Sequence, residues 1–149
     1  MGIDFNLVNV EIKKANAAIT VLSEEKTLVK WRAIAERYGG NKKYSFQFWD
    51  ELDDPGVLCI ENGWEIIAGF IAPLKNICLL FELEDEKKSF FFKYGNELSE
   101  VLVESGIRDF YLCDEHMDFL ICYNDHDIIV ADGLAKTWLR SLRASGPMS

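Results

Sequence analysis

Apolar positions recur at helical spacing near the start of the chain. Between Phe5 and Leu22 they follow one another three or four residues apart, which places them on one stripe of an amphipathic helix. A second apolar stripe begins after Ser23, a residue type that favours the N-cap of a helix, and it ends at Gly39-Gly40, which favour a helix C-terminus. The pattern therefore predicts a helical hairpin at the N-terminus.

A polar connection rich in aromatic residues follows these two helices. Tyr44, Phe46 and Phe48 alternate with polar residues, which predicts a short strand or an extended edge. The connection ends in Asp-Asp-Pro-Gly at 53–56, a strong turn signal. Beyond this turn, the apolar run at 57–60 gives Cys59 strand-like surroundings, but the conformation of residues 57–71 stays open.

Apolar runs separated by short polar turns occupy the remaining chain. The run at 64–71 fits a strand or a short helix, and its periodicity decides for neither. Helical spacing predicts one helix from Asn96 to Glu104 and a closing helix after Asp132. Strand-like runs lie at 77–83, 89–94, 109–113, 119–123 and 127–131, the last three forming an antiparallel meander.

Together these elements predict one α+β domain over residues 1–149. We expect a largely antiparallel sheet of about five strands, with helices packed on one face, the helical hairpin at the start and a C-terminal helix. No internal repeat or linker divides the sequence. Residues 144–149 are small and polar, so we expect them to form a frayed tail.

Composition narrows the class of protein. Apolar residues make up 49% of the 149 residues, enough to bury a core, and no apolar run reaches the length of a membrane span. The N-terminus lacks the pattern of a secretory signal, and we expect a soluble cytoplasmic protein. Cys59, Cys78, Cys113 and Cys122 lie in apolar surroundings without C-x-x-C spacing, which predicts buried reduced thiols, with a disulfide between two of them as the alternative.

Charge is distributed very unevenly along the chain. Residues 43–135 carry twenty Asp or Glu against six Lys or Arg, whereas residues 1–42 and 136–149 are net positive. This excess of negative charge disfavours nucleic acid as a partner, because phosphate binding needs a concentrated basic face. It favours a basic protein partner, whose approach an acidic field accelerates. The closing helix carries a basic stripe, which we expect to face solvent.

Two polar turns combine histidine with carboxylates, one at 114–116 and one containing Asp125, His126 and Asp127. Consecutive turns of a meander lie at opposite ends of the strand between them. Six residues at ~3.3 Å each separate them by about 20 Å, so one metal ion cannot bind both. Asp, Asn and His are also common turn formers. We therefore expect turn-forming roles or a binding surface, with a metal-dependent enzyme that uses Asp125, His126 and Asp127 as the alternative.

Motifs for catalysis are absent from the sequence. Neither a nucleophile elbow nor a glycine-rich phosphate loop occurs, and no cofactor motif accompanies the acidic residues. We therefore predict a non-enzymatic protein without a metal or cofactor.

A run of four carboxylates follows Trp49. An aromatic anchor with an acidic rim fits a hot spot for a basic protein, and a loop tryptophan that covers the edge of the core is the alternative. The predicted partner-binding residues are Trp49, Asp50, Glu51, Asp53, Asp54, Asp125, His126 and Asp127.

The order of the predicted elements permits a comparison with a known family. Two helices precede the turn Asn62-Gly63-Trp64, a hairpin at 77–94 and a meander, and a helix with apolar residues from Leu134 to Leu142 ends the chain. This order resembles the SUKH-like bacterial immunity proteins, and residues 110–133 also resemble small uncharacterised bacterial families. The resemblance implies an α+β protein that neutralises a toxin domain, often a basic nuclease, by binding it. It carries over no individual binding residue.

These observations give one leading expectation. We expect a cytoplasmic protein that binds a basic protein partner, a toxin domain in the immunity-type interpretation, and that binds neither nucleic acid nor membrane. A structural or regulatory subunit is a further alternative, and the sequence leaves the oligomeric state open.

Overall fold

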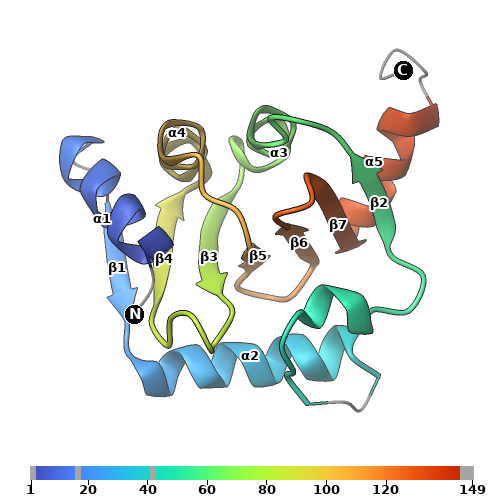
Figure 1. Cartoon of the computed structure of the whole chain (residues 1–149), viewed down its shortest axis with the longest axis horizontal. Helices are drawn as coiled ribbons and strands as arrows, with labels where there is room; N and C mark the ends of the chain where they lie inside the picture. Colours follow the sequence, from blue (N-terminus) through green and yellow to red (C-terminus); the bar gives the residue numbers. More distant parts are fainter. Residues whose placement is uncertain (1–2, 16–17, 41–42, 145–149) are drawn as a thin grey trace.

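A seven-stranded antiparallel sheet forms the middle of the molecule (Figure 1). The computed structural model describes residues 3–15, 18–40 and 43–144. The strands lie side by side in the order β1-β4-β3-β5-β6-β7-β2, so segments from both halves of the chain meet in one sheet. The strands are β1 (Ile19–Leu22), β2 (Gly56–Cys59), β3 (Lys75–Phe81), β4 (Ser89–Tyr94), β5 (Phe110–Asp114), β6 (Phe119–Tyr123) and β7 (Ile128–Gly133), and the helices are α1 (Ile3–Ala15), α2 (Glu24–Tyr38), α3 (Trp64–Ile71), α4 (Gly95–Ser105), α5 (Leu134–Ala144) and the 3-10 helix η1 (Phe48–Glu51).

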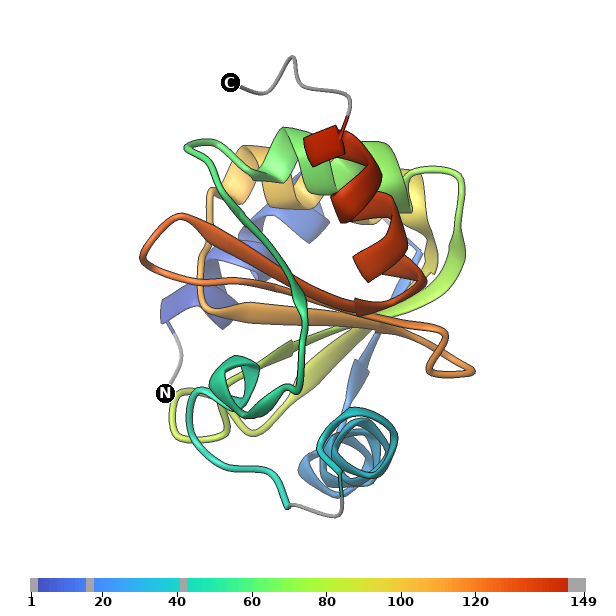
Figure 2. The ribbon, with the colours of Figure 1, turned by 90° about the vertical axis from the view of Figure 1, so that its right-hand side faces the viewer.

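Helices cover both faces of this sheet, as Figure 2 shows. One layer holds α1, α3, α4 and α5, and the other holds α2 and η1. Successive residues of β3 alternate between the layers: Ile77 and Leu79 belong to the core of the first, Cys78 and Leu80 to the core of the second. Because both faces are covered, the central strands are continuous apolar runs without alternating polar residues.

Much of the predicted element order is confirmed. The α+β class, the hairpin of β3 and β4, the meander of β5, β6 and β7 and the closing helix all occur. The run at 64–71, which left two structures open, forms helix α3. The helical spacing of Ile67 and Ile71, four residues apart, buries both side chains in the same layer of the core.

The predicted N-terminal helical hairpin is wrong. Helix α1 ends at Ala15, and the last part of the expected helix forms the edge strand β1. Ile19, Thr20 and Val21 are β-branched residues, which favour strands, and they pair with residues 90–92 of β4. The strand also carries the chain past the edge of the sheet, so that α1 and α2 lie on opposite faces rather than against each other (Figure 2).

The sheet has seven strands where about five were predicted, and the prediction of helices on one face is wrong. The additional strands are the short edge strands β1 and β2, which flank the sheet on its two sides. The apolar residues of α2 cover the second face of the sheet, and Trp31, Ile34 and Ala35 are buried against it. A sheet whose central strands are apolar on both sides needs a helix on each face to remove them from water.

The aromatic alternation at 44–48 does not form a strand. Gln47 has a left-handed backbone (φ 57°), which interrupts an extended run, and η1 begins at Phe48. The three aromatic side chains have different surroundings: Phe48 is buried, Tyr44 is partly buried and Phe46 is exposed. The alternation of aromatic and polar residues in this segment therefore does not mark one buried face of a strand, because each aromatic side chain has its own surroundings.

The cysteines are free thiols, as expected, and all but one of them are buried. All four are free, and Cys78, Cys113 and Cys122 are buried. Cys78 and Cys113 are direct partners across β3 and β5. Cys59, expected inside a strand, is exposed at the end of the edge strand β2. Burial raises the pKa of the Cys122 thiol, which disfavours a thiolate there.

The end of the chain is described as far as Ala144, the last residue of α5. The expected tail beyond it, at 145–149, lies outside the described residues. None of the helices in the described ranges is both long enough and apolar enough to cross a membrane.

Candidate protein-binding surface

A buried asparagine builds the turn between β6 and β7. The Asn124 side chain is fully buried, and its Oδ1 accepts hydrogen bonds from the backbone N–H groups of His126 (2.9 Å) and Ile128 (3.2 Å). Asp127 takes the left-handed conformation (φ 58°) that Asp tolerates better than most residues. The turn thus adopts the local structure that its polar sequence predicts.

Asp127 holds this turn against the rest of the molecule. Its Oδ1 lies 2.9 Å from Arg108 Nη2 in an ion pair and 3.1 Å from the Tyr123 hydroxyl. The Arg108 guanidinium lies over the Trp64 ring, 5.2 Å from its centroid. Of the predicted cluster, Asp127 therefore has a structural role, because its contacts are within the molecule.

Asp125 and His126 project from the same turn toward solvent. Their side chains are 60% and 64% exposed, and His126 Nε2 lies 3.5 Å from Asp125 Oδ1. The Asp125 backbone N–H donates to Asp109 Oδ1 at 3.0 Å. This bond places a second carboxylate, from the residue before β5, beside the turn.

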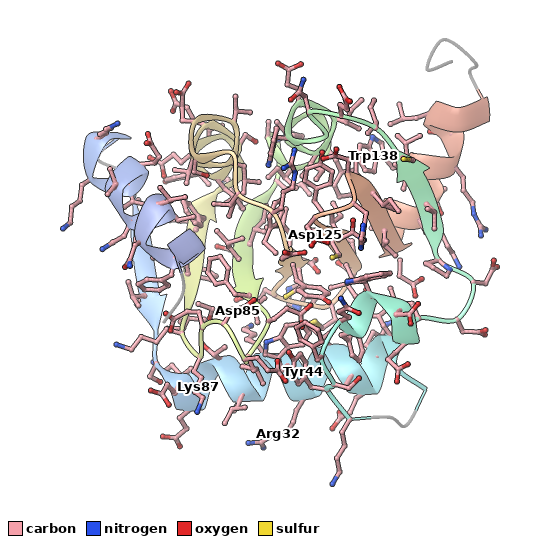
Figure 3. The ribbon with its side chains drawn as sticks, viewed as in Figure 1. Arg32, Tyr44, Asp85, Lys87, Asp125 and Trp138 are labelled. Carbon is pink, nitrogen blue, oxygen red and sulfur yellow. The ribbon has the colours of Figure 1, made fainter. Side chains whose placement is uncertain are left out.

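Three carboxylates from three separate segments lie at this end of the sheet. Burial raises the pKa of Asp109, and the neighbouring charges of Asp125 and Asp85 raise it further. Asp85 belongs to the loop between β3 and β4, which lies on the same side of the molecule as the β6–β7 turn (Figures 1 and 3). We call Asp85, Asp109 and Asp125 the acidic end. Its like charges repel one another, so a cation placed there would lower the electrostatic energy.

A buried glutamate lies just before the loop that carries Asp85. Glu82 is 3% exposed, and its Oε1 accepts from the Tyr44 hydroxyl (2.8 Å) and the Gln47 N–H (3.1 Å). Its Oε2 accepts from the Tyr111 hydroxyl at 2.8 Å. Burial raises the pKa of Glu82, and the three donors oppose that rise. The network attaches the connection before η1 to the sheet.

The predicted run from Trp49 to Asp54 does not stay together at one site. Trp49 is partly buried against the core on the α2 side, and its backbone N–H donates to the Tyr111 hydroxyl at 3.1 Å. Asp54, at the other end of the run, pairs with Arg140 of α5 at 3.0 Å. Asp50 and Asp53 are exposed, and Glu51 is partly exposed.

Two basic residues of α5 form polar contacts at the surface. Lys136 Nζ lies 3.7 Å from Asp132 Oδ1 and donates to the Asp54 carbonyl at 3.3 Å. Arg140 binds the side chain of the same Asp54. The last carboxylate of the predicted acidic run is therefore paired with α5.

The two turns that contain histidine lie at opposite ends of β6, as Figure 2 shows and as the strand length predicts. In the first, Asp114 Oδ1 accepts from the N–H groups of Asp118 (2.6 Å) and Phe119 (3.4 Å), so this carboxylate also forms a turn. Among the described residues, no group of three or more His, Cys, Asp or Glu side chains is placed to hold a metal ion.

Sequence reasoning missed the residues that complete the acidic end. Asp85 lies in a charged loop of five residues and Asp109 begins a predicted strand, so neither differs from an ordinary surface carboxylate in the sequence. The antiparallel pairing of β3 with β5 and of β5 with β6 brings both near the β6–β7 turn. Only the strand order predicts this proximity, and it requires the pairing to be known.

Comparison of the chain with models of protein families, with curated proteins and with solved structures found no significant match.

Proposed function

We propose that this protein binds a basic protein partner through its acidic end. The observation that carries the proposal is the convergence of Asp85, Asp109 and Asp125, whose mutual repulsion raises the pKa of Asp109 after the larger effect of burial. A lysine or arginine of a partner that approached these carboxylates would relieve the repulsion and form charge-assisted hydrogen bonds.

The rigidity of the surrounding structure supports the same proposal. Asn124 and Asp127 fix the turn that presents Asp125, and the Glu82 network holds the neighbouring connection. A surface that is ordered before binding loses less conformational entropy when the partner arrives. The exposed side chain of His126 lies beside the acidic end, with its Nε2 3.5 Å from Asp125 Oδ1.

The finer proposal is an immunity-type role, in which the partner is a toxin domain. Its support is the net charge of −9, concentrated in residues 43–135, together with the order of elements that resembles SUKH-like immunity proteins. Binding of the toxin would cover a basic functional surface, so neutralisation needs no catalytic group on this chain.

Co-expression with the product of an adjacent reading frame tests this proposal. A basic toxin-like product should co-purify with the wild-type chain, and Asp85→Asn with Asp125→Asn should release it at moderate salt. Glu100→Gln with Glu104→Gln changes the net charge by the same amount on α4, where both side chains are exposed, and should leave the complex intact. Equal loss with both double variants would show that net charge alone, and not the acidic end, drives association.

A further inference from the structure

A pocket of about 650 Å³ opens beside α2, in the layer opposite α1. Its walls include Trp31 and Tyr44, and Leu83 closes it on the side of the sheet. The volume falls in the range of small-molecule sites, roughly 300–1,000 Å³. The pocket is separate from the acidic end, and the inference drawn from it does not depend on the proposed function.

Its aromatic wall is held in place from behind. The rings of Trp31 and Tyr44 lie 4.6 Å apart between centroids, and Trp31 also makes edge contacts with Phe48 and Tyr111. The Tyr44 hydroxyl lies within hydrogen-bond distance of Glu82 (2.8 Å) and Glu84 (2.7 Å), which share its one hydrogen, and it accepts from the Leu83 N–H. These bonds fix the ring, so the wall exists before any ligand binds. Preformed apolar walls of this kind suit flat ligands.

The pocket carries a positive charge in an acidic protein. Arg32 and Lys43 line it, with Glu36 as the one carboxylate on its wall. Both basic side chains are exposed, and neither forms an ion pair within the described part of the chain. Figure 3 shows Arg32 extending from α2 and Tyr44 close to the same helix. Two unpaired cations near an aromatic wall fit an anionic group on a flat ligand.

An unused hydrogen-bond donor belongs to the same wall. Trp31 is 1% exposed, and its indole Nε1 has no hydrogen-bond partner among the described residues. A buried donor without a partner is costly, so structures retain few of them. The nitrogen is buried, so its N–H signal reports on the packing behind the pocket wall.

We propose that this pocket binds a small planar aromatic carboxylate. The ring would pack against Tyr44, which Trp31 supports from behind, and the carboxylate would accept hydrogen bonds from Arg32 and Lys43. Removal of both cations would weaken binding of the anion but not of a neutral ligand with the same ring.

Titration of the ¹⁵N-labelled full chain with 2-naphthoate tests this proposal, with the Trp31 indole N–H signal as the readout. We expect a saturable shift of that signal with a Kd of about 0.1–1 mM, as ligand efficiency suggests for a ligand of this size. Arg32→Gln with Lys43→Gln should weaken 2-naphthoate binding at least about tenfold, because each cation offers a charge-assisted bond. The neutral amide, 2-naphthamide, should bind the wild-type chain more weakly than 2-naphthoate does. Its affinity should be the same for the wild-type chain and for this double variant.

The matched control is Lys13→Gln with Lys93→Gln, which removes the same charge from exposed positions on α1 and β4. It should retain wild-type affinity for 2-naphthoate. The proposal is overturned if the Trp31 signal does not saturate, if the amide binds as tightly as the carboxylate, or if the control weakens binding as much as the pocket variant does.

Discussion

The Tyr111 hydroxyl lies 2.8 Å from Oε2 of Glu82, inside the protein, and also accepts a hydrogen bond from the Trp49 N–H. One phenol therefore connects a central strand, a buried carboxylate and the start of η1. A buried glutamate is rare unless its oxygens are satisfied, and here both are. This relationship explains why a segment without strand pairing is nevertheless attached to the sheet.

Tyr111→Phe should lower the free energy of unfolding by about 1–3 kcal/mol, because it leaves Glu82 Oε2 and the Trp49 N–H without this partner. Urea unfolding followed by circular dichroism measures the change. Tyr94→Phe is the control, since Tyr94 is exposed and its hydroxyl makes no hydrogen bond within the described residues; it should change stability by less than about 0.5 kcal/mol. Equal effects of the two variants would show that the network contributes nothing specific.

Asn124→Ala should destabilise the fold by about 2 kcal/mol, because two backbone donors of the β6–β7 turn lose their acceptor in a buried position. Asn96→Ala removes an exposed asparagine at which the sequence predicts the start of a helix, whereas α4 begins at Gly95 with no side-chain cap. That control should be neutral within about 0.5 kcal/mol. Thermal unfolding of the two variants compares them, and a larger loss from Asn96→Ala would contradict the assignment of both residues.

Gly95→Ala should prevent stable folding or cost more than about 4 kcal/mol. A Cβ atom at Gly95 would overlap the backbone carbonyls of Ile71 and Leu74, which cannot move without displacing the end of α3. Gly69→Ala, in the middle of α3, meets nothing within 4 Å and should stabilise the protein by about 0.5–1 kcal/mol through helix propensity. Expression yield and melting temperature report both outcomes; a folded Gly95→Ala variant of wild-type stability would refute the close approach.

Asp109→Asn should raise the melting temperature at pH 7 and have less effect in acid. Burial and then the charges of Asp125 and Asp85 raise the pKa of Asp109 in the folded state. A raised pKa means that the folded protein holds this proton more tightly, so the contribution to stability is complete below the unfolded pKa of about 4 and is lost as the pH rises through the folded pKa. Asparagine keeps the acceptor for the Asp125 N–H without the charge.

Melting curves between pH 3 and 8 measure this difference. Asp53→Asn removes an exposed carboxylate that has no ion pair among the described residues, and its effect should vary less with pH. If Asp109→Asn lowers stability at pH 7, the burial and repulsion of the Asp109 charge together are not a net cost.

The sequence predicts elements well where periodicity and turn chemistry agree. The β5–β6–β7 meander follows from apolar runs bounded by Asp- and Asn-rich turns, and α2 follows from Ser23 and the terminal glycines. The spacing at Ile19 and Leu22 fits a helix and a strand alike, and only pairing with β4 decides for the strand. Local patterns cannot supply that distant partner.

The candidate site was only partly predictable, because it too depends on contacts between segments that are distant in the sequence. The turn with Asp125 and His126 was visible as a dense polar cluster, but the Asp127 carboxylate pairs with Arg108 within the molecule. Asp54 was expected to belong to the binding surface, and it pairs with α5 instead. Asp85 and Asp109 join Asp125 through strand order alone, which a single sequence does not contain.

The salt dependence of the association rate with the basic partner tests the central claim most directly. For the wild-type chain, stopped-flow measurements between about 20 and 500 mM salt should show a steep fall in the association rate, because screening removes electrostatic steering. Asp85→Asn with Asp125→Asn should flatten this dependence and slow association at low salt, whereas Glu100→Gln with Glu104→Gln should keep most of it. An association rate that is independent of salt, or equal in the two double variants, would contradict the claim that the acidic end binds the partner.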